Sequence, residues 1–375
     1  MSTDPAIRAG SVLEIDLGAI VANWRLLAAR AGPAQCAAVV KANGYGLGAA
    51  PVAKALRAAG CRLFFVATLD EGIGLRDALG QESEIAVLNG PLPGTVEEFA
   101  AHALIPVLNE PGQMEKWRKL AEERGGLPAI LHVDTGMSRL GLSAREFAAF
   151  ADDLPRWKAI RWRLLMSHLA CADTPEYELN ETQRRRFEAA RQRLPEMPAS
   201  LAASSGIFLG PGYHFDLVRP GAALYGVNPQ PGEPNPLRPV VRLCGKILQI
   251  REIDRGESVG YGAAHIMDSP GRVATVAVGY ADGWLRSLSQ RGCGHIAGTR
   301  VPLLGRVSMD LLTFDVSAVD PALAHPGAMI ELLGESYGVD DVAADAGTIG
   351  YEILSALGSR YHRIYRQSAA PKPPA

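Results

Sequence analysis

Short apolar runs alternate with longer amphipathic stretches over the first three-fifths of the chain. Several runs are apolar at successive positions, as parallel strands covered on both faces should be. Eight such runs are predicted strands: 37–41, 63–67, 85–88, 105–108, 129–133, 163–168, 201–203 and 216–219. Helical stretches lie between them, among them 111–124 and 177–193. Eight strands with crossovers indicate an α/β fold, a closed (β/α)8 TIM barrel, with a doubly wound open sheet as the alternative.

The pattern changes after about residue 235. Apolar runs separated by glycine-rich turns predict strands at 240–251, 273–278, 301–304, 311–316 and 329–333. A helical period returns only at 342–357. This texture predicts a second, β-rich domain. Five prolines in 229–239 predict an extended, fairly stiff linker between the two.

A short strand at 12–16 precedes the barrel, and Asp16 is placed to cap the helix that follows. We expect this strand to pair outside the barrel, with the C-terminal domain. The expected organisation is therefore a cofactor-binding barrel at 12–235, a β-rich domain at 236–367 and a flexible tail at 368–375.

Composition and charge argue against several classes of function. The 375 residues carry a formal net charge of −2, which gives no chain-wide attraction to nucleic acid or to acidic membrane lipids. No apolar run reaches membrane-spanning length, and no basic start followed by an apolar stretch suggests a signal peptide. The five cysteines are scattered without a CxxC pair, so we expect reduced thiols, a cytoplasmic protein and no metal site.

Barrel enzymes build their sites at the carboxyl ends of the strands. The predicted ends hold charged or hydrogen-bonding side chains: Lys41, Asp134 with Arg139 just beyond, His168, Ser204 with Ser205, and Arg219. Lys41 leaves an apolar strand and enters a glycine-rich turn, so its amine is partly desolvated. A neutral amine is the nucleophile that imine formation with an aldehyde cofactor needs. The lysine precedes the glycines, so the segment is not a Walker loop.

Seven ordered segments make the chain resemble the alanine racemases, the fold-type III pyridoxal phosphate enzymes. They are VKANGYGLG at 40–48, VDTGMSRLG at 133–141, VRPG at 218–221 with LYG at 224–226, VGYG at 259–262, GYADG at 279–283, GRVSMD at 305–310 and TIGYE at 348–352. The resemblance spans about residues 12–365. It implies a barrel plus a β domain, the fold that the strand pattern also predicts.

The resemblance also implies a site. Lys41 would carry pyridoxal 5'-phosphate as an imine and act as one base, and Tyr261 of the partner subunit in a homodimer would be the other. Arg219 would face the ring nitrogen, with His168 beside it. The phosphate would be surrounded by Tyr45, Ser205, Gly221, Ala222 and Tyr351, and Ser204 would be a further cofactor-binding residue. Arg139 and the backbone of Met309 would hold the substrate carboxylate, and Tyr280 and Asp310 would line the entrance.

Three positions depart from the family pattern. His132 stands where many members have a lysine, often carbamylated, whose negative charge orients the arginine that corresponds to Arg139. Histidine cannot carry that charge, which leaves the role to another anion such as chloride. Gly260 replaces a serine before the catalytic tyrosine, and Ser204 replaces an asparagine.

The implied function is two-base isomerisation of L- and D-alanine, supplying D-alanine for peptidoglycan. A broad-specificity amino-acid racemase on the same scaffold is the first alternative, because the pocket walls cannot be placed from sequence. A non-catalytic pyridoxal phosphate-binding protein is the second. The β-rich domain and Tyr261 argue against it, since a carrier needs neither.

Overall fold

The computed structural model describes residues 5–368 and divides into two compact units. The barrel unit contains residues 20–224 and 228–237. The β unit contains the described residues up to 19, residues 225–227 and the described residues from 238 onward.

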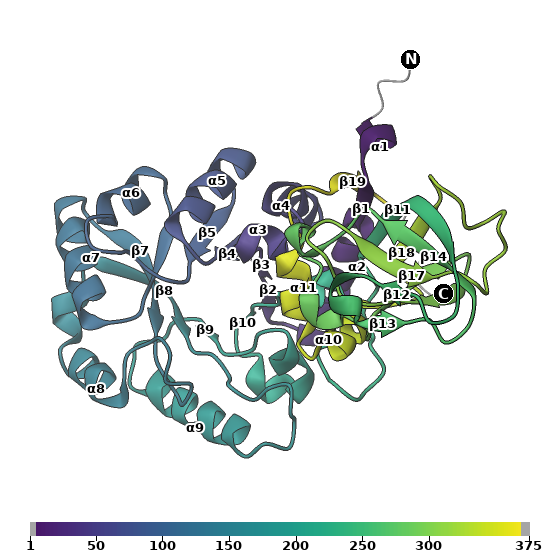
Figure 1. Ribbon diagram of the computed structural model, residues 1–375. Helices are drawn as coiled ribbons and strands as arrows, with labels where there is room; N and C mark the ends of the chain where they lie inside the picture. Colours follow the sequence, from purple (N-terminus) through teal and green to yellow (C-terminus); the bar gives the residue numbers. More distant parts are fainter. Residues whose placement is uncertain (1–4, 369–375) are drawn as a thin grey trace, which may run out of the picture. The chain divides into compact units, whose positions relative to one another are not determined.

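The barrel unit is built on a closed ring of eight parallel strands (Figure 1). Its strands are β2 (Gln35–Cys36) with β3 (Ala38–Val39), β4 (Leu63–Val66), β5 (Glu84–Val87), β6 (Ile105–Leu108), β7 (Leu127–His132), β8 (Ile160–Met166), β9 (Ala199–Ser200) and β10 (Leu217–Val218). Pairing runs in order from β3 to β9. A parallel bridge between Ala203 and Arg219 joins the last two strands, and β10 pairs with β2. Closure confirms the (β/α)8 prediction over the open sheet.

Helices cover the outside of this ring, as Figure 1 shows for α5 to α9. The helices are α4 (Ala49–Ala58), α5 (Leu69–Leu79), α6 (Val96–Ala101), α7 (Pro111–Glu123), α8 (Ala144–Asp152) and α9 (Leu179–Gln192). Capping boxes start two of them, with Thr68 before α5 and Ser143 before α8. Short 3₁₀ turns complete the unit: η1 (Leu154–Trp157), η2 (Ser205–Leu209), η3 (Pro211–Tyr213) and η4 (Ala222–Tyr225).

The core of the barrel unit follows from strands that are buried on both faces. All four residues of β6 are buried, as are three of four in β4 and in β5. Burial of successive residues is what a parallel sheet covered by helices requires. The largest fully buried side chains of this unit are Trp117, Phe64, Phe65, Phe99 and Phe187.

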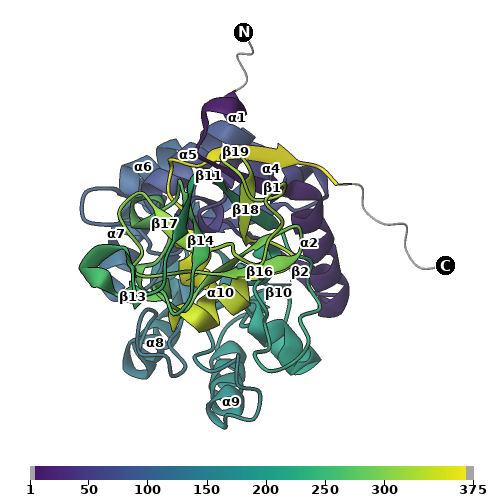
Figure 2. The ribbon, with the colours of Figure 1, turned by 45° about the vertical axis from the view of Figure 1, so that its right-hand side comes forward.

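The β unit is organised around one long strand, β11 (Val241–Ile253), which pairs with β1, β14 and β18. The other strands are β1 (Ser11–Asp16), β14 (Gly271–Val276), β15 (Cys293–Ile296), β16 (Thr299–Pro302), β17 (Leu312–Asp315), β18 (Met329–Leu333) and β19 (His362–Arg366), with a small hairpin of β12 (Ser258–Val259) and β13 (His265–Ile266). The sheet order is β16-β15-β18-β11-β1-β19, with β14 between β11 and β17 (Figure 2). A bridge from Leu303 to Phe314 joins β16 to β17, so six strands form a second, smaller ring.

The first strand has the partners expected for it. β1 runs antiparallel to β11 and parallel to β19. Asp16 Oδ1 accepts the Ala19 amide at 2.9 Å and thereby caps α2 (Leu17–Ala31). The hydroxyl of Ser368 donates to the Asp16 carboxylate, so the first residue of the predicted tail is anchored. Residues 369–375 of that tail lie outside the described part of the chain.

Some sequence expectations are wrong in detail. The strand predicted at 201–203 lies two residues earlier, as β9 (Ala199–Ser200). The helix at 342–357 is two helices, α10 (Val339–Ala346) and α11 (Gly350–Ala356), because Gly347 turns the chain in the left-handed region with φ of 70°. The proline-rich linker is not extended throughout. Asn228 Nδ2 donates to the Glu233 carbonyl at 2.8 Å, and Glu233 N donates to Gln230 O at 3.1 Å, which closes a turn.

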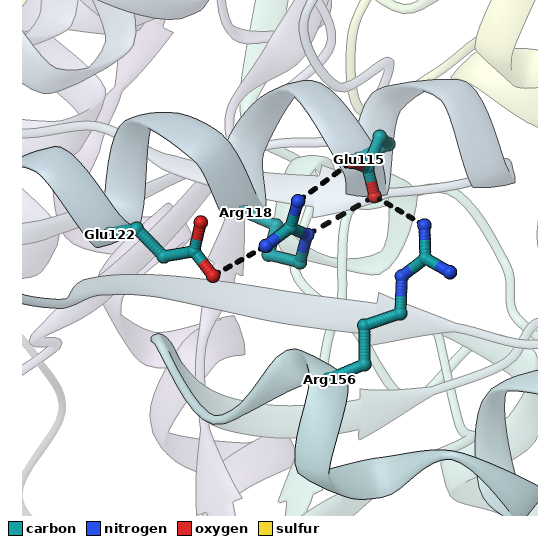
Figure 3. Close-up of polar contacts among 4 residues, drawn as sticks. All are labelled: Glu115, Arg118, Glu122 and Arg156. Carbon is teal, nitrogen blue, oxygen red and sulfur yellow. Dashed lines mark hydrogen bonds and ion pairs between the residues drawn. The ribbon is translucent and has the colours of Figure 1, made fainter.

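A four-residue ion network ties two elements of the barrel unit's outer surface together (Figure 3). Arg118 on α7 donates to Glu115 Oε1 at 2.8 Å and to Glu122 one turn further along. Arg156 of η1 reaches Glu115 Oε2 at 3.0 Å. These hydrogen bonds, led by Arg118, lower the pKa of Glu115 to about 2.

Candidate active site

Lys41 opens a left-handed turn at the carboxyl end of β3. The predicted strand 37–41 stops at Val39, because the short element α3 (Lys41–Tyr45) leaves the strand at once. Ala42, Asn43 and Tyr45 have φ of 52°, 53° and 53°, a region that L-residues rarely adopt in succession. Such strain costs on the order of 1–3 kcal/mol per residue and persists only where neighbours enforce it. The turn therefore marks a constrained position.

Glu71 is one of the enforcing neighbours, and its role was not predicted. Its two carboxylate oxygens accept the Ala42 amide at 2.6 Å and the Ala67 amide at 2.8 Å. Burial and the nearby Arg139 lower the pKa of Lys41, while Glu71 acts in the opposite sense. The neutral amine is therefore more accessible than in an exposed lysine. The capping-box spacing of Thr68 and Glu71 could have singled out this residue.

Arg219 is a buried cation held by neutral partners. Its guanidinium donates to Ser200 Oγ, to the Ser167 carbonyl at 2.6 Å and, more weakly, to the Leu201 carbonyl at 3.5 Å. It also donates to His168 Nδ1 at 3.5 Å. No carboxylate is among these contacts, and burial lowers the pKa of Arg219. A buried cation with neutral partners is an electrostatic feature suited to an electron-rich ligand atom.

Two histidines beside this cation are neutral. Burial, followed by the charge of Arg219, lowers the pKa of His168 to about 3 and that of His132 to about 3. Because arginine only donates, His168 Nδ1 must be the acceptor, and its proton lies on Nε2. His132 Nδ1 lies 2.7 Å from Asn109 Oδ1, a residue that sequence reasoning did not single out.

A tight turn after β7 presents Arg139. Asp134 accepts the Gly136 and Met137 amides at 2.9 Å each and the Ser138 amide at 3.0 Å. Burial raises the pKa of Asp134, but these three donors outweigh it and the pKa is lowered. Arg139 itself is exposed. A small cavity at the base of this turn is lined by His132, Asp134, Met137, Arg139, Leu140, Ser167 and His168.

Three of the residues expected to bind the cofactor, Tyr45, Ser204 and Gly221, meet at the end of β10. A Cβ on Gly221 would lie 2.3 Å from Tyr45 Oη, so only glycine lets that hydroxyl approach. Ser204 Oγ accepts the Gly221 amide at 3.0 Å and the Ala223 amide at 3.1 Å, which leaves its own proton to donate. Ala222 is buried and Ser205, the first residue of η2, is half-buried.

The remaining candidates belong to the β unit. Tyr261 follows β12 and is 72% exposed, and Met309 is 54% exposed. Two loops carry Tyr280 and Met309, and they are bonded to each other, with Ala281 N donating to Met309 O at 2.9 Å. Tyr351 lies on α11 and is also exposed. The structure therefore gathers the barrel candidates, Tyr45 included, in one unit, and Tyr261, Tyr280, Tyr351, Met309 and Asp310 in the other.

Arg360 secures the two loops of the β unit, and sequence reasoning missed it. Its Nε pairs with Asp282 at 2.8 Å and its Nη1 with Asp310 at 2.7 Å. Asp282 is only 2% exposed, and its other oxygen accepts the Gly279 amide at 2.8 Å. No local sequence pattern links residue 360 to loops 50 and 78 positions earlier.

Within residues 5–368, no cluster of three or more His, Cys, Asp or Glu side chains could hold a metal ion. The same residues contain no helix of the length and hydropathy that crossing a bilayer requires. All five cysteines are free and at least partly buried.

Comparison with known proteins identifies the family. The alanine racemase N-terminal domain matches residues 15–229, and the C-terminal domain matches 240–365. Alanine racemases of Mesorhizobium japonicum, there called catabolic, and Rhodospirillum rubrum are each 54% identical, over 95% and 96% of this chain and 93% and 96% of theirs. The crystal structure of alanine racemase from Bartonella henselae with covalently bound pyridoxal phosphate is 41% identical, covers 96% of this chain and 100% of its own, and superposes with a TM-score of 0.92. The chain belongs to the alanine racemase family of pyridoxal phosphate-dependent isomerases.

Proposed function

We propose that the protein interconverts L- and D-alanine by a two-base mechanism, in sites shared between two subunits. The observation that carries the proposal is the environment of Lys41. Its amine stands on a strained turn at the carboxyl edge of the barrel, where burial and Arg139 lower its pKa and make the neutral, nucleophilic form more accessible. A neutral amine there can both bind an aldehyde and exchange a proton with a substrate.

The side chains of the barrel unit fit pyridoxal phosphate. Lys41 Nζ would bind the aldehyde, and the buried Arg219, which has only neutral contacts, would face the ring nitrogen with neutral His168 at its side. When bound, the cofactor withdraws electrons from the substrate's α-carbon and makes its proton acidic. A permanent cation opposite the ring nitrogen keeps that nitrogen unprotonated, which limits side reactions.

The phosphate would be held by hydroxyls and backbone rather than by a lysine cluster. Tyr45 Oη reaches the backbone of Gly221, and the Ser204 hydroxyl retains a free proton. Neutral donors of this kind bind phosphate well. The other members of the proposed set are Ser205, Ala222 and Tyr351.

The two proton carriers would stand on opposite faces of the α-carbon. Lys41 Nζ would remove or return the proton on one face, and Tyr261 Oη of the partner subunit on the other. Two different bases on opposite faces give inversion, whereas one base alone favours retention. Arg139 and the backbone of Met309 would hold the carboxylate, with Tyr280 and Asp310 lining the entrance.

Exposure in the single chain supports a homodimer. Tyr261, Tyr280 and Met309 are large side chains that are 72%, 43% and 54% exposed. Side chains of this size gathered in neighbouring loops are typical of surfaces that a partner covers. We assign residues 12–235 to the cofactor-binding domain, apart from the first strand at 12–16, which pairs in the β unit, and residues 236–367 to the domain that supplies Tyr261.

Rates with L- and D-alanine on cofactor-loaded protein test the proposal. We expect both directions to proceed, with exchange of the α-proton for solvent deuterium. Serine, lysine and arginine in parallel distinguish an alanine enzyme from a broad-specificity racemase. If the cofactor-loaded protein shows neither racemisation nor exchange of the α-proton, it is a non-catalytic pyridoxal phosphate-binding protein.

The product would be D-alanine for peptidoglycan, made in the cytoplasm, where five free thiols stay reduced. A catabolic role is the second candidate, because the Mesorhizobium japonicum relative carries that word in its name. Deletion of the gene decides between them. A biosynthetic enzyme leaves cells dependent on D-alanine, whereas a catabolic one leaves them unable to grow on D-alanine as a carbon source.

A further inference from the structure

A fully buried glutamine lies behind the loops that follow β7 and β8. Gln183 on α9 has no exposed surface and makes three hydrogen bonds. Its Oε1 accepts the Ala170 amide at 2.8 Å. Its Nε2 donates to the His168 carbonyl at 2.8 Å and to Thr135 Oγ1 at 3.2 Å. All three contacts fall on the backbone around His168 or on the loop that leads to Arg139.

These contacts form a continuous chain of hydrogen bonds. The Ala170 amide can only donate, so Oε1 is fixed as the acceptor and both Nε2 protons are committed. Thr135 Oγ1 therefore accepts from Gln183, and it shares a second hydrogen bond with Ser167 Oγ at 2.8 Å. Ser167 in turn offers its carbonyl to Arg219 at 2.6 Å. The chain runs from α9 to the guanidinium and the imidazole of the candidate site.

We propose that Gln183 is a positioning residue for cofactor binding: it fixes Ser167 and His168, and through them Arg219, against the ring of the cofactor. This inference rests on the proposed function. Removal of Gln183 leaves the Ala170 amide, the His168 carbonyl and the Thr135 hydroxyl without these partners. A buried polar group without a hydrogen-bond partner destabilises the local structure that holds it. The cost falls on the geometry around His168 because that is where the bonds end.

Asn180 provides a matched control on the same helix. It is 1% exposed and donates to the Cys171 carbonyl at 3.1 Å and the Thr174 carbonyl at 3.0 Å. It therefore holds the same loop by the same chemistry, but three or more residues beyond His168. A general loss of packing by α9 would affect both positions, whereas positioning of His168 depends on Gln183.

The experiment compares Gln183→Met, Thr135→Val and Asn180→Leu in the full-length protein. The readouts are the dissociation constant of pyridoxal phosphate, the absorption maximum of the bound cofactor, and hydrogen exchange of the Ala170 amide. We expect Gln183→Met to weaken cofactor binding about tenfold or more, by the size of such buried penalties. The absorption maximum should shift, and the amide of Ala170 should exchange faster.

Thr135→Val interrupts the same chain one link later, so it should act in the same direction. The double variant should lose less than the sum of the two single losses, because both belong to one chain. Asn180→Leu should bind the cofactor within about twofold of the unmodified protein. Thr135→Val also carries the test if Gln183→Met does not fold.

Equal cofactor affinity and spectra in Gln183→Met and Asn180→Leu would overturn the inference, as would strict additivity of Gln183→Met and Thr135→Val. Racemisation by the unmodified protein is measured separately. If it fails while cofactor binding still depends on Gln183, the proposed function is wrong and the positioning role stands. If racemisation proceeds and cofactor affinity does not depend on Gln183, the proposed function stands and the positioning role is wrong.

Discussion

His132 Nδ1 donates a hydrogen bond to Asn109 Oδ1 at 2.7 Å. The direction follows from the amide, whose Nδ2 donates to the Leu88 carbonyl at 2.9 Å and the Val107 carbonyl at 3.1 Å, so Oδ1 faces the ring. Burial, Arg219 and Arg139 lower the pKa of His132 to about 3. A neutral imidazole therefore occupies the place where a carbamylated lysine would bring negative charge.

This pair predicts that activity does not depend on bicarbonate, because an imidazole in a hydrogen bond offers no amine for carbamate formation. Arg139→Ala should still raise the KM for alanine, by about 10- to 100-fold for loss of a charged hydrogen bond to a carboxylate. Rates with and without bicarbonate in degassed buffer measure the first part. Activation by bicarbonate that disappears in a His132 variant would contradict it.

Lys41 is expected to carry the cofactor covalently. Borohydride should reduce the linkage and leave the cofactor on the peptide that contains Lys41, as detected by mass spectrometry. Lys41→Ala should abolish labelling, while Lys54→Ala, an exposed lysine on the next helix, should not change it. Labelling that persists in Lys41→Ala would show that another residue carries the cofactor.

Arg219→Glu is expected to place an acceptor where the structure has a buried cation. A carboxylate there would favour protonation of the ring nitrogen and prolong the life of negative charge on the substrate. Racemisation should slow, a long-wavelength absorption band should accumulate and transamination should increase. Arg219→Lys keeps the charge and serves as the control. Spectra and kinetics unchanged in Arg219→Glu would exclude Arg219 from the site.

The network around Glu115 predicts a pH-dependent contribution to stability. The folded-state pKa is lowered from 4.5 to about 2, chiefly by Arg118 and Arg156. A carboxylate with a depressed pKa stabilises the fold above pH about 4.5, and the contribution is lost as the pH falls toward 2. Because the side chain is 30% exposed, we expect no more than about 1 kcal/mol after screening.

Urea midpoints measure this contribution. Glu115→Gln should lower the midpoint at pH 7, and the difference from the unmodified protein should shrink as the pH falls below about 4.5. Glu122→Gln is the control, since Glu122 contacts Arg118 but not Arg156. A difference that stays constant with pH would show that Glu115 acts through packing rather than charge.

Sequence reasoning succeeded where pattern and packing coincide. The strands at 105–108 and 329–333 agree with β6 and β18 to the residue, because each is a mostly apolar segment bounded by polar or turn-forming residues. Sequence reasoning missed the strands whose formation depends on tertiary contacts rather than on a local pattern. β12 and β13 are two residues each, too short for any period, and β19, with the sequence HRIYR at the sheet edge beside β1, has only two adjacent apolar residues and no alternation.

The same limit applies to the site. Strand-end chemistry indicated Lys41, His168 and Arg219, because the carboxyl edge of a barrel is known in advance. The residues that hold them in place, such as Glu71 and Gln183, lie on helices, and only the folded backbone brings them there. Their polar side chains read as ordinary helix surface until burial is known.

The central claim is that each active site combines Lys41 of one subunit with Tyr261 of the partner subunit. Lys41→Ala and Tyr261→Phe, each expected to be nearly inactive, test it when co-expressed with two different tags. A mixed dimer with shared sites has one site with both defects and one with neither. Purified by both tags, it should regain about half of the unmodified activity. A fully loaded mixed dimer no more active than its parents would contradict the shared site.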